Sequence, residues 1–213
     1  AKFFAKILDV REPPPSGLLI IGAGNVARAI GKELQAQGFK VVLTDSTWEN
    51  ISLARMDGLE TYYGNPISEH ADRHLNLIGL GKVLAISGRS NLDTLACLKF
   101  KSEFGVKNVY ELKSSREKHI DEKHIVSTRH RGYELFGENV AYGNLAYLLR
   151  NGAEIKSTQL SDEFTFEQYL EKYGERVTPL FAIDNKQHIQ IFVANGKMKP
   201  ESGWTVIGMI QAG

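Results

Sequence analysis

The sequence predicts an α/β fold in which a doubly wound parallel sheet is followed by a small α+β lobe. Three observations support this prediction. Short apolar runs alternate with segments of helical periodicity through the first half of the chain. A glycine-rich turn joins the first apolar run to the first helical segment. After residue 152 the pattern changes to short alternating strands that are separated by turn residues.

The first half of the chain contains five runs that we predict as strands; the first is continuously apolar, as expected for a strand covered on both faces, and the third is weaker. These runs are Gly17–Ile21, Lys40–Thr44, Leu59–Tyr63, Lys82–Ile86 and Asn108–Leu112. The segments between them have helical spacing, and we expect helices at Asn25–Gln37, Trp48–Met56, Pro66–Leu75 and Asn91–Phe104. Parallel strands need such crossover connections, so the alternation predicts a parallel sheet.

The remaining segments set the predicted domain limits. Residues 1–16 form a lead-in, with apolar residues at helical spacing, and a linker, because the three prolines at positions 13–15 stop a helix. The main domain is expected at 17–152. It includes a polar stretch, 113–137, without an assigned role. The small lobe is expected at 153–213. The last predicted elements are helices at Asn139–Arg150 and Phe164–Tyr173 and strands at Val177–Ile183, His188–Ala194 and Trp204–Ile210.

Composition excludes some classes of protein. The chain has 26 basic and 25 acidic residues, and this balance argues against a nucleic-acid surface. The one cysteine, Cys97, cannot form an internal disulfide, and the chain has no signal-like start, so we expect a cytosolic location. No apolar run approaches the roughly 18–20 residues of a membrane helix. Because the chain begins at Ala1 rather than Met, we expect a fragment of a longer protein.

The turn after the first strand carries the clearest functional signal. It reads Gly-Ala-Gly-Asn-Val-Ala and matches the dinucleotide-binding pattern G-x-G-x-x-A of Rossmann folds. The first glycine permits the tight turn, and the second lets a pyrophosphate approach the backbone. The N-terminus of the following helix offers N–H groups and the positive end of a dipole. The predicted nucleotide-binding residues in this turn are Gly22, Ala23, Gly24, Asn25 and Val26.

Further candidates follow the other strands. Asp45 ends the second strand, where an acidic residue can bind ribose hydroxyls. Ser46 follows it without an arginine, which favours a ribose that lacks a 2′-phosphate. The turns after strands three and four add Gly64, Asn65, Ser87 and Arg89. Arg89 is expected either to meet a phosphate or to lie in solvent. The other open alternative is a Rossmann sheet in which the glycines serve only packing and no ligand binds.

Signals for catalysis and metal binding are missing from the sequence. It contains no Tyr-x-x-x-Lys pair, no G-x-x-x-x-G-K-[ST] phosphate loop and no G-x-S-x-G turn. His70 and His74 have a metal-compatible spacing, but the glutamate of H-E-x-x-H and a third ligand are missing. A solvated helix face is the preferred interpretation. Cys97 is interpreted as a buried structural thiol. We therefore predict no catalytic and no metal-binding residue.

Residues 17–112 resemble the TrkA-N domain, which is the Rossmann half of RCK (regulator of potassium conductance) modules. The resemblance rests on GLLIIGAGNVARAI with VVLTDS, on GLETYYGNP followed by GKVLAIS, and on NLDTLACLKFKSEFGVKNVYEL. Among RCK modules, the sequence most resembles the cytoplasmic tail of some bacterial monovalent cation:proton antiporters. Lys199–Ile210 resembles the closing strand of the RCK C-terminal lobe, although Trp204 replaces an aspartate of that pattern.

The resemblance implies a regulatory domain rather than an enzyme. It implies that NAD(H) or an adenine nucleotide (AMP, ADP or ATP) binds at the glycine turn, at Asp45 and at Gly64-Asn65. It also implies a homodimer through the Rossmann domain and an attached membrane transporter domain, a K⁺ or Na⁺:proton antiporter. The domain would then be cytoplasmic and tethered to the inner membrane through an N-terminal transmembrane region. Two alternatives stay open: a small NAD-dependent oxidoreductase with its substrate lobe at 153–213, and a dimerisation scaffold with a vestigial cleft.

Overall fold

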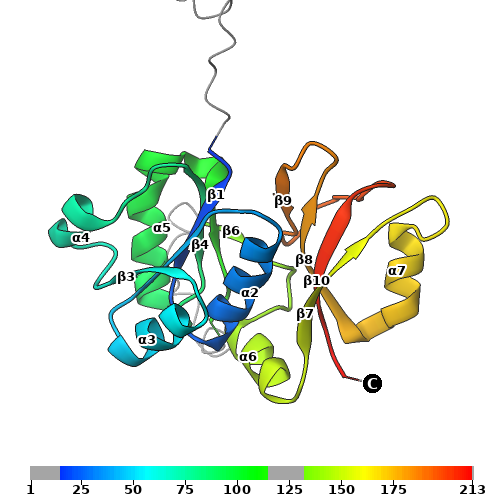
Figure 1. Cartoon of the computed structure of the whole chain (residues 1–213), viewed down its shortest axis with the longest axis horizontal. Helices are drawn as coiled ribbons and strands as arrows, with labels where there is room; N and C mark the ends of the chain where they lie inside the picture. Colours follow the sequence, from blue (N-terminus) through cyan, green and yellow to red (C-terminus); the bar gives the residue numbers. More distant parts are fainter. Residues whose placement is uncertain (1–14, 115–131, 213) are drawn as a thin grey trace, which may run out of the picture.

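The first of two sheets is fully parallel and gives the molecule its Rossmann half (Figure 1). The computed structural model describes residues 15–114 and 132–212. The sheet has six strands in the order β3-β2-β1-β4-β5-β6, and every pairing is parallel. The strand order reverses direction at β1, as in doubly wound sheets, which confirms the predicted fold class. The strands are β1 (Gly17–Ile21), β2 (Val41–Asp45), β3 (Glu60–Tyr63), β4 (Leu80–Ala85), β5 (Val109–Glu111) and β6 (Tyr133–Glu134).

Helices cover both faces of this sheet because successive strand residues point to opposite sides. On β1, Leu18 and Ile20 belong to one buried cluster, and Leu19 and Ile21 belong to another. The first cluster includes residues of α2 and α3, and the second includes residues of α5. Crossover helices on alternate faces are the expected consequence of right-handed βαβ connections. The helices of this half are α2 (Asn25–Ala36), α3 (Trp48–Met56), α4 (Glu69–His74) and α5 (Ser90–Phe104).

The second sheet is antiparallel and has four strands in the order β7-β10-β8-β9. Helix α7 packs on its outer face through Phe166 and Tyr169. This helix begins with a capping box between Thr165 and Gln168, which satisfies N–H groups that the first turn leaves free. The elements of this half are α6 (Tyr142–Arg150), β7 (Glu154–Gln159), α7 (Phe166–Tyr173), β8 (Val177–Ile183), β9 (Ile189–Ile191) and β10 (Thr205–Ile210).

The two sheets share one hydrophobic core. Helices α2 and α6 lie between them (Figure 1). One cluster of buried residues contains Ile30 of α2, Leu84 of β4 and Phe181 of β8. An isolated bridge between Leu135 and Val193 also joins the two halves. The middle layer therefore fixes the second sheet against the Rossmann half. The division at residue 152 stays a prediction.

Two strands and one helix differ from the sequence expectations. Strands β6 and β7 were not predicted. Most β7 residues are exposed, so the strand lacks an apolar signal. Helix α4 is shorter than the predicted 66–75 because the Ser68 hydroxyl accepts a hydrogen bond from Ala71 N–H and caps the helix there. The predicted lead-in helix and most of the polar stretch lie outside the described residues. Across the described parts of the chain, no helix is long and apolar enough to cross a bilayer.

Candidate functional site

The glycine-rich turn lies where the ends of β1 and β4 approach each other. Gly22 has a φ of +108°, and a Cβ at this position would lie 2.6 Å from the Ser87 Cα. Only glycine tolerates both the backbone conformation and the close contact. Gly24 precedes α2 as its N-cap and has an ordinary backbone conformation. Gly24 offers no side-chain cap to this helix and the first turn holds no acidic residue, although Asn25 Oδ1 accepts a hydrogen bond from Val26 N–H at 3.0 Å. The positive end of the helix dipole is therefore available to an anion.

Asp45 ties the turn to the neighbouring loops. Its carboxylate is 4% exposed and accepts hydrogen bonds from Ala23 N–H at 3.0 Å, Thr47 N–H at 2.9 Å and Asn50 Nδ2 at 3.0 Å. Arg89 Nη2 adds an ion pair at 3.3 Å. Burial alone would raise the pKa of Asp45, but the hydrogen bonds from Thr47, Ala23 and Asn50 outweigh it and lower the pKa. Asp45 is therefore held ionised, with its acceptor sites in use.

The structure brings Arg89 and Ser46 to this carboxylate. Arg89 reaches from the loop after β4, and its Nη1 also donates to the Ser46 hydroxyl at 3.4 Å. Its side chain is 48% exposed, compared with 3% for Asp45. The sequence left open whether Arg89 meets a phosphate or lies in solvent. The structure places Arg89 beside Asp45, with about half of its side chain exposed to solvent. Another hydrogen-bond donor can therefore take the place of its guanidinium at this carboxylate.

The turn after β3 contributes backbone rather than side chains. Gly64 N–H donates to the Asp45 carbonyl oxygen at 2.9 Å, so this turn abuts the end of β2. The Asn65 side chain accepts from Ile67 N–H at 3.2 Å and its carbonyl accepts from Ser68, which forms the turn before α4. Asn65 therefore has a local structural role, and no contact joins its side chain to the Asp45 cluster.

Ser87 connects the loop after β4 to a buried acid that the sequence analysis missed. Its N–H donates to Asp93 Oδ1 at 3.1 Å, and its hydroxyl accepts from Arg89 N–H at 3.1 Å. Asp93 is 1% exposed, and its Oδ2 has no hydrogen-bond partner within the described residues. Desolvation raises the pKa of Asp93 to about 7, although the hydrogen bonds from Ser87 oppose the shift and nearby Glu111 adds to it.

Tyr142, the first residue of α6, occupies the crevice between the two loops. A Cβ at Gly24 would lie 2.6 Å from its hydroxyl oxygen, and a Cβ at Gly88 would lie 2.8 Å from its ring. The ring is therefore placed where a pyrophosphate approaches the glycine turn in Rossmann folds. Burial raises the pKa of Tyr142, and the Asp45 and Asp93 carboxylates raise it further.

Buried polar residues concentrate at this edge of the sheet. In the described part of the chain, the polar residues that are buried lie near the carboxyl ends of parallel strands or near the start of α5: Thr44, Asp45, Asp93, Thr94, Glu111 and Ser114. Thr94 Oγ1 donates to Glu111 Oε1 at 2.9 Å. Burying polar groups is costly, and ligands bind at the carboxyl ends of strands in such sheets. The edge that surrounds the glycine turn is thus the candidate functional site.

The histidine pair lies apart from this site. His70 and His74 stack on exposed α4 with ring centroids 4.0 Å apart, and His70 Nδ1 shares a hydrogen bond with the Tyr62 hydroxyl at 2.8 Å. Among the residues with described positions, no group of three or more His, Cys, Asp or Glu is arranged to hold a metal ion. Cys97 is fully buried, and desolvation raises the pKa of its thiol to about 12, so the thiol is unreactive.

The strand order and the glycine turn define a Rossmann-type domain with its crevice between β1 and β4. The family model of the TrkA-N domain matches residues 18–127, and the chain belongs to this family. Domains of this family are regulatory domains of potassium transport systems, are typically not enzymes, and bind nucleotides such as NAD. The recognised family is therefore confirmed, and the antiporter context stays a prediction. No curated protein matches the chain.

Several solved structures are similar to the chain at low sequence identity. The GsuK channel is 12% identical with a TM-score of 0.46, and the match covers 95% of this chain and 37% of that one. The GsuK RCK domain is 13% identical with a TM-score of 0.42, over 99% of this chain and 50% of that one. N5-carboxyaminoimidazole ribonucleotide synthetase from Thermotoga maritima is 14% identical with a TM-score of 0.34, over 90% and 45%. The chain thus spans half or less of the length of each.

Proposed function

We propose that this chain is the nucleotide-sensing regulatory domain of a K⁺ or Na⁺:proton antiporter. The observation that carries the sensing role is the set of buried polar groups around the glycine turn and the N-terminus of α2. The antiporter context rests on the sequence resemblance of residues 17–112 to such tails. In this proposal the domain is cytoplasmic, is attached to a membrane transporter domain, and forms a homodimer through its Rossmann half.

The proposed ligand is NAD(H) or an adenine nucleotide without a 2′-phosphate. Its phosphates would lie at the N-terminus of α2, against the backbone of Gly22, Ala23 and Gly24. A ribose hydroxyl would donate to Asp45, whose acceptor sites are all in use. Arg89 binds this carboxylate through a long side chain that is 48% exposed, so we expect the ribose to replace Arg89 there. The released guanidinium could then pair with a phosphate.

Tyr142 supplies a route from the ligand to the second sheet. A phosphate at the glycine turn and the Tyr142 ring would compete for the same space. The ring belongs to the first turn of α6, which packs on α2 and leads through Gly152 into β7. Displacing the ring would therefore shift α6 in the layer between the sheets. A ligand that binds better to the displaced state shifts the population toward it.

The oxidoreductase alternative has weaker support from the same site. Hydride transfer needs a proton donor beside the cofactor. Tyr142 offers the hydroxyl nearest to the glycine turn, but burial and two carboxylates raise its pKa. A hydroxyl with a raised pKa releases its proton less readily, so this side chain is poorly suited to acid catalysis at neutral pH.

The test is thermal unfolding of the chain with NAD, NADH, AMP, ADP or ATP, each added alone. A ligand at 100 times its dissociation constant stabilises the folded state by about 2.7 kcal/mol. We expect one of these nucleotides to raise the midpoint, and Asp45→Asn to lose the response. Asp184→Asn is the matched control, because this carboxylate also accepts backbone hydrogen bonds but lies in the second half.

Two other outcomes separate the alternatives. If none of the five nucleotides changes the midpoint, the chain is a scaffold with a vestigial cleft and the sensing proposal is wrong. If the protein oxidises NADH with a small carbonyl substrate, the oxidoreductase alternative replaces it.

A further inference from the structure

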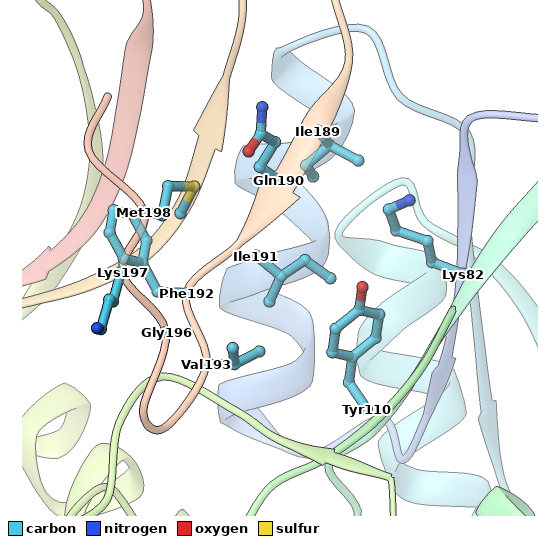
Figure 2. Close-up of a pocket in the computed structure, with 10 residues that line it drawn as sticks. All are labelled: Lys82, Tyr110, Ile189, Gln190, Ile191, Phe192, Val193, Gly196, Lys197 and Met198. Carbon is cyan, nitrogen blue, oxygen red and sulfur yellow. The ribbon is translucent and has the colours of Figure 1, made fainter. Parts of the chain in front are cut away.

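A second cavity lies between the two sheets, away from the glycine turn. Its volume is about 360 Å³, which falls within the roughly 300–1,000 Å³ of small-molecule sites. Lys82 of β4 and Tyr110 of β5 form one side, and β9 with the loop that follows it forms the other (Figure 2). Lys82 precedes Ser87 by five residues, or roughly 16 Å of strand, so the cavity is separate from the nucleotide site.

The cavity contains a lysine on a sheet face that is otherwise apolar. Lys82 shares this face of β4 with Leu84, which belongs to the core between the sheets. The Lys82 ammonium forms no hydrogen bond or ion pair with any residue of the described chain, and burial lowers its pKa. A half-buried lysine without a counter-ion is costly, and an apolar residue would pack here at lower cost. This arrangement suggests a bound anion that compensates the charge.

Tyr110 supplies a second polar group to the same cavity (Figure 2). Its ring packs against the core between the sheets. Its hydroxyl has no hydrogen bond to the residues that the structure describes, and desolvation is the main cause that raises its pKa. The Tyr110 hydroxyl and the Lys82 ammonium line the same cavity, so it offers two donors of the kind that bind a carboxylate.

The opposite wall is mostly apolar, and its polar residues are Gln190 and Lys197. Ile189 and Ile191 of β9 face the Rossmann sheet, and Val193 continues this side (Figure 2). The lining residues include no aspartate or glutamate; they include a second lysine, Lys197, which is exposed. The cavity thus combines one half-buried positive charge with a hydrophobic wall.

We propose that this cavity binds a small organic anion. The carboxylate of the ligand contacts the Lys82 ammonium and the Tyr110 hydroxyl, and its apolar body packs on Ile189 and Ile191. Such a ligand touches both sheets at once. It therefore stabilises their present arrangement by its own binding free energy. The proposal does not depend on nucleotide binding at the glycine turn.

The test uses benzoate as the probe and amide chemical shifts of the ¹⁵N-labelled chain as the readout. Benzoate is expected to shift the amide signals of Gln190 to Val193 and of Tyr110 and to saturate. Benzamide has the same shape without the charge and should bind about tenfold more weakly or worse. Inorganic phosphate has the charge without the apolar body and should also bind more weakly. Equal binding of either compound would overturn the proposal.

Variants assign the charge to one lysine. Lys82→Met keeps the length of the side chain and should weaken benzoate binding about tenfold or more. Lys186→Met is the matched control, because this exposed lysine does not line the cavity, and it should change the affinity less than twofold. The spectrum of each variant reports its folding directly. If Lys82→Met fails to fold, Tyr110→Phe is the independent test, and it should weaken benzoate binding several-fold. Unchanged binding in both Lys82→Met and Tyr110→Phe would refute the site, whatever the nucleotide titrations show.

Discussion

Tyr142 sets the affinity of the glycine turn for phosphates in our proposal. Its ring lies between Gly24 and Gly88, so a nucleotide must first displace it. We expect Tyr142→Ala to bind the nucleotide several-fold to about tenfold more tightly. In this variant no ring has to be displaced, so the whole population is competent to bind. Isothermal titration of both proteins measures this change.

Tyr147 provides the matched control for that substitution. It lies on the same helix, α6, but its side chain is 60% exposed. Tyr147→Ala should leave the affinity unchanged. Weaker binding in Tyr142→Ala would mean that the ring forms part of the ligand site, and the displacement mechanism would then be wrong.

Asp93 makes the stability of the fold depend on pH near neutrality. Its pKa is raised from 3.8 to about 7, so the folded state binds more protons than the unfolded state between these values. The free energy of unfolding should fall as the pH rises from about 4 to about 7, by at most about 1.4 kcal/mol per pH unit. In urea unfolding at several pH values, Asp93→Asn should lack this decrease.

The control for the pH series is Asp184→Asn. The pKa of Asp184 is lowered by hydrogen bonds from the His188 and Lys186 backbones, which outweigh desolvation. Its contribution to stability is therefore lost only when the pH falls through that low value, and the slope between pH 5 and 8 should stay as in the parent. An identical slope in Asp93→Asn and the parent would show that Asp93 is ionised in the folded state.

Part of the candidate site could be predicted from the sequence, and part could not. The turn at Gly22 and Gly24 and the position of Asp45 follow from the spacing between a strand end and a helix start. Asp93 looked like an ordinary first-turn residue of a helix, because its burial depends on how α5 packs. Tyr142 reaches Gly24 from more than a hundred residues away, and no local pattern signals this contact.

At the scale of elements, the β1–α2 turn depends on glycine for a steric reason. Gly22→Ala combines a φ of +108° with a Cβ 2.6 Å from the Ser87 backbone. We expect a loss of about 3 kcal/mol or more in unfolding free energy, above the ~1–3 kcal/mol of a strained backbone alone. Gly38→Ala has a φ of +88°, but its Cβ would meet no described atom within 4 Å, so it should lose only about 1–2 kcal/mol. Equal losses in urea unfolding would exclude the steric contribution.

The strands with the clearest sequence signal are those whose burial is complete. All residues of β1 and β2 are buried; β1 appears in the sequence as an unbroken apolar run, and β2 begins with three apolar residues. Strand β7 exposes most of its residues, and β6 has only two residues beside a polar stretch. Such edge strands form through pairing with a neighbour that is already in place, and their own residues carry little signal.

At the scale of the whole molecule, the proposed homodimer needs an apolar surface on the Rossmann half. Helix α5 exposes Leu95 and Leu98, which are 50% and 48% exposed. We expect Leu98→Glu to weaken the dimer by tenfold or more, because it places a charge in the contact. Sedimentation equilibrium measures this, and Leu170→Glu on α7 is the control, since Leu170 is exposed on the other half. A dimer that tolerates Leu98→Glu would exclude this face of α5.

The layer of α2 and α6 between the sheets also limits how the chain can be divided. The core there takes Ile30 from the first half and Phe181 from the second, so neither half contains its own complete interior. A fragment that ends at the predicted boundary of 152 would expose an apolar surface to solvent. Such a fragment would tend to aggregate during expression, and a useful truncation has to keep both sheets.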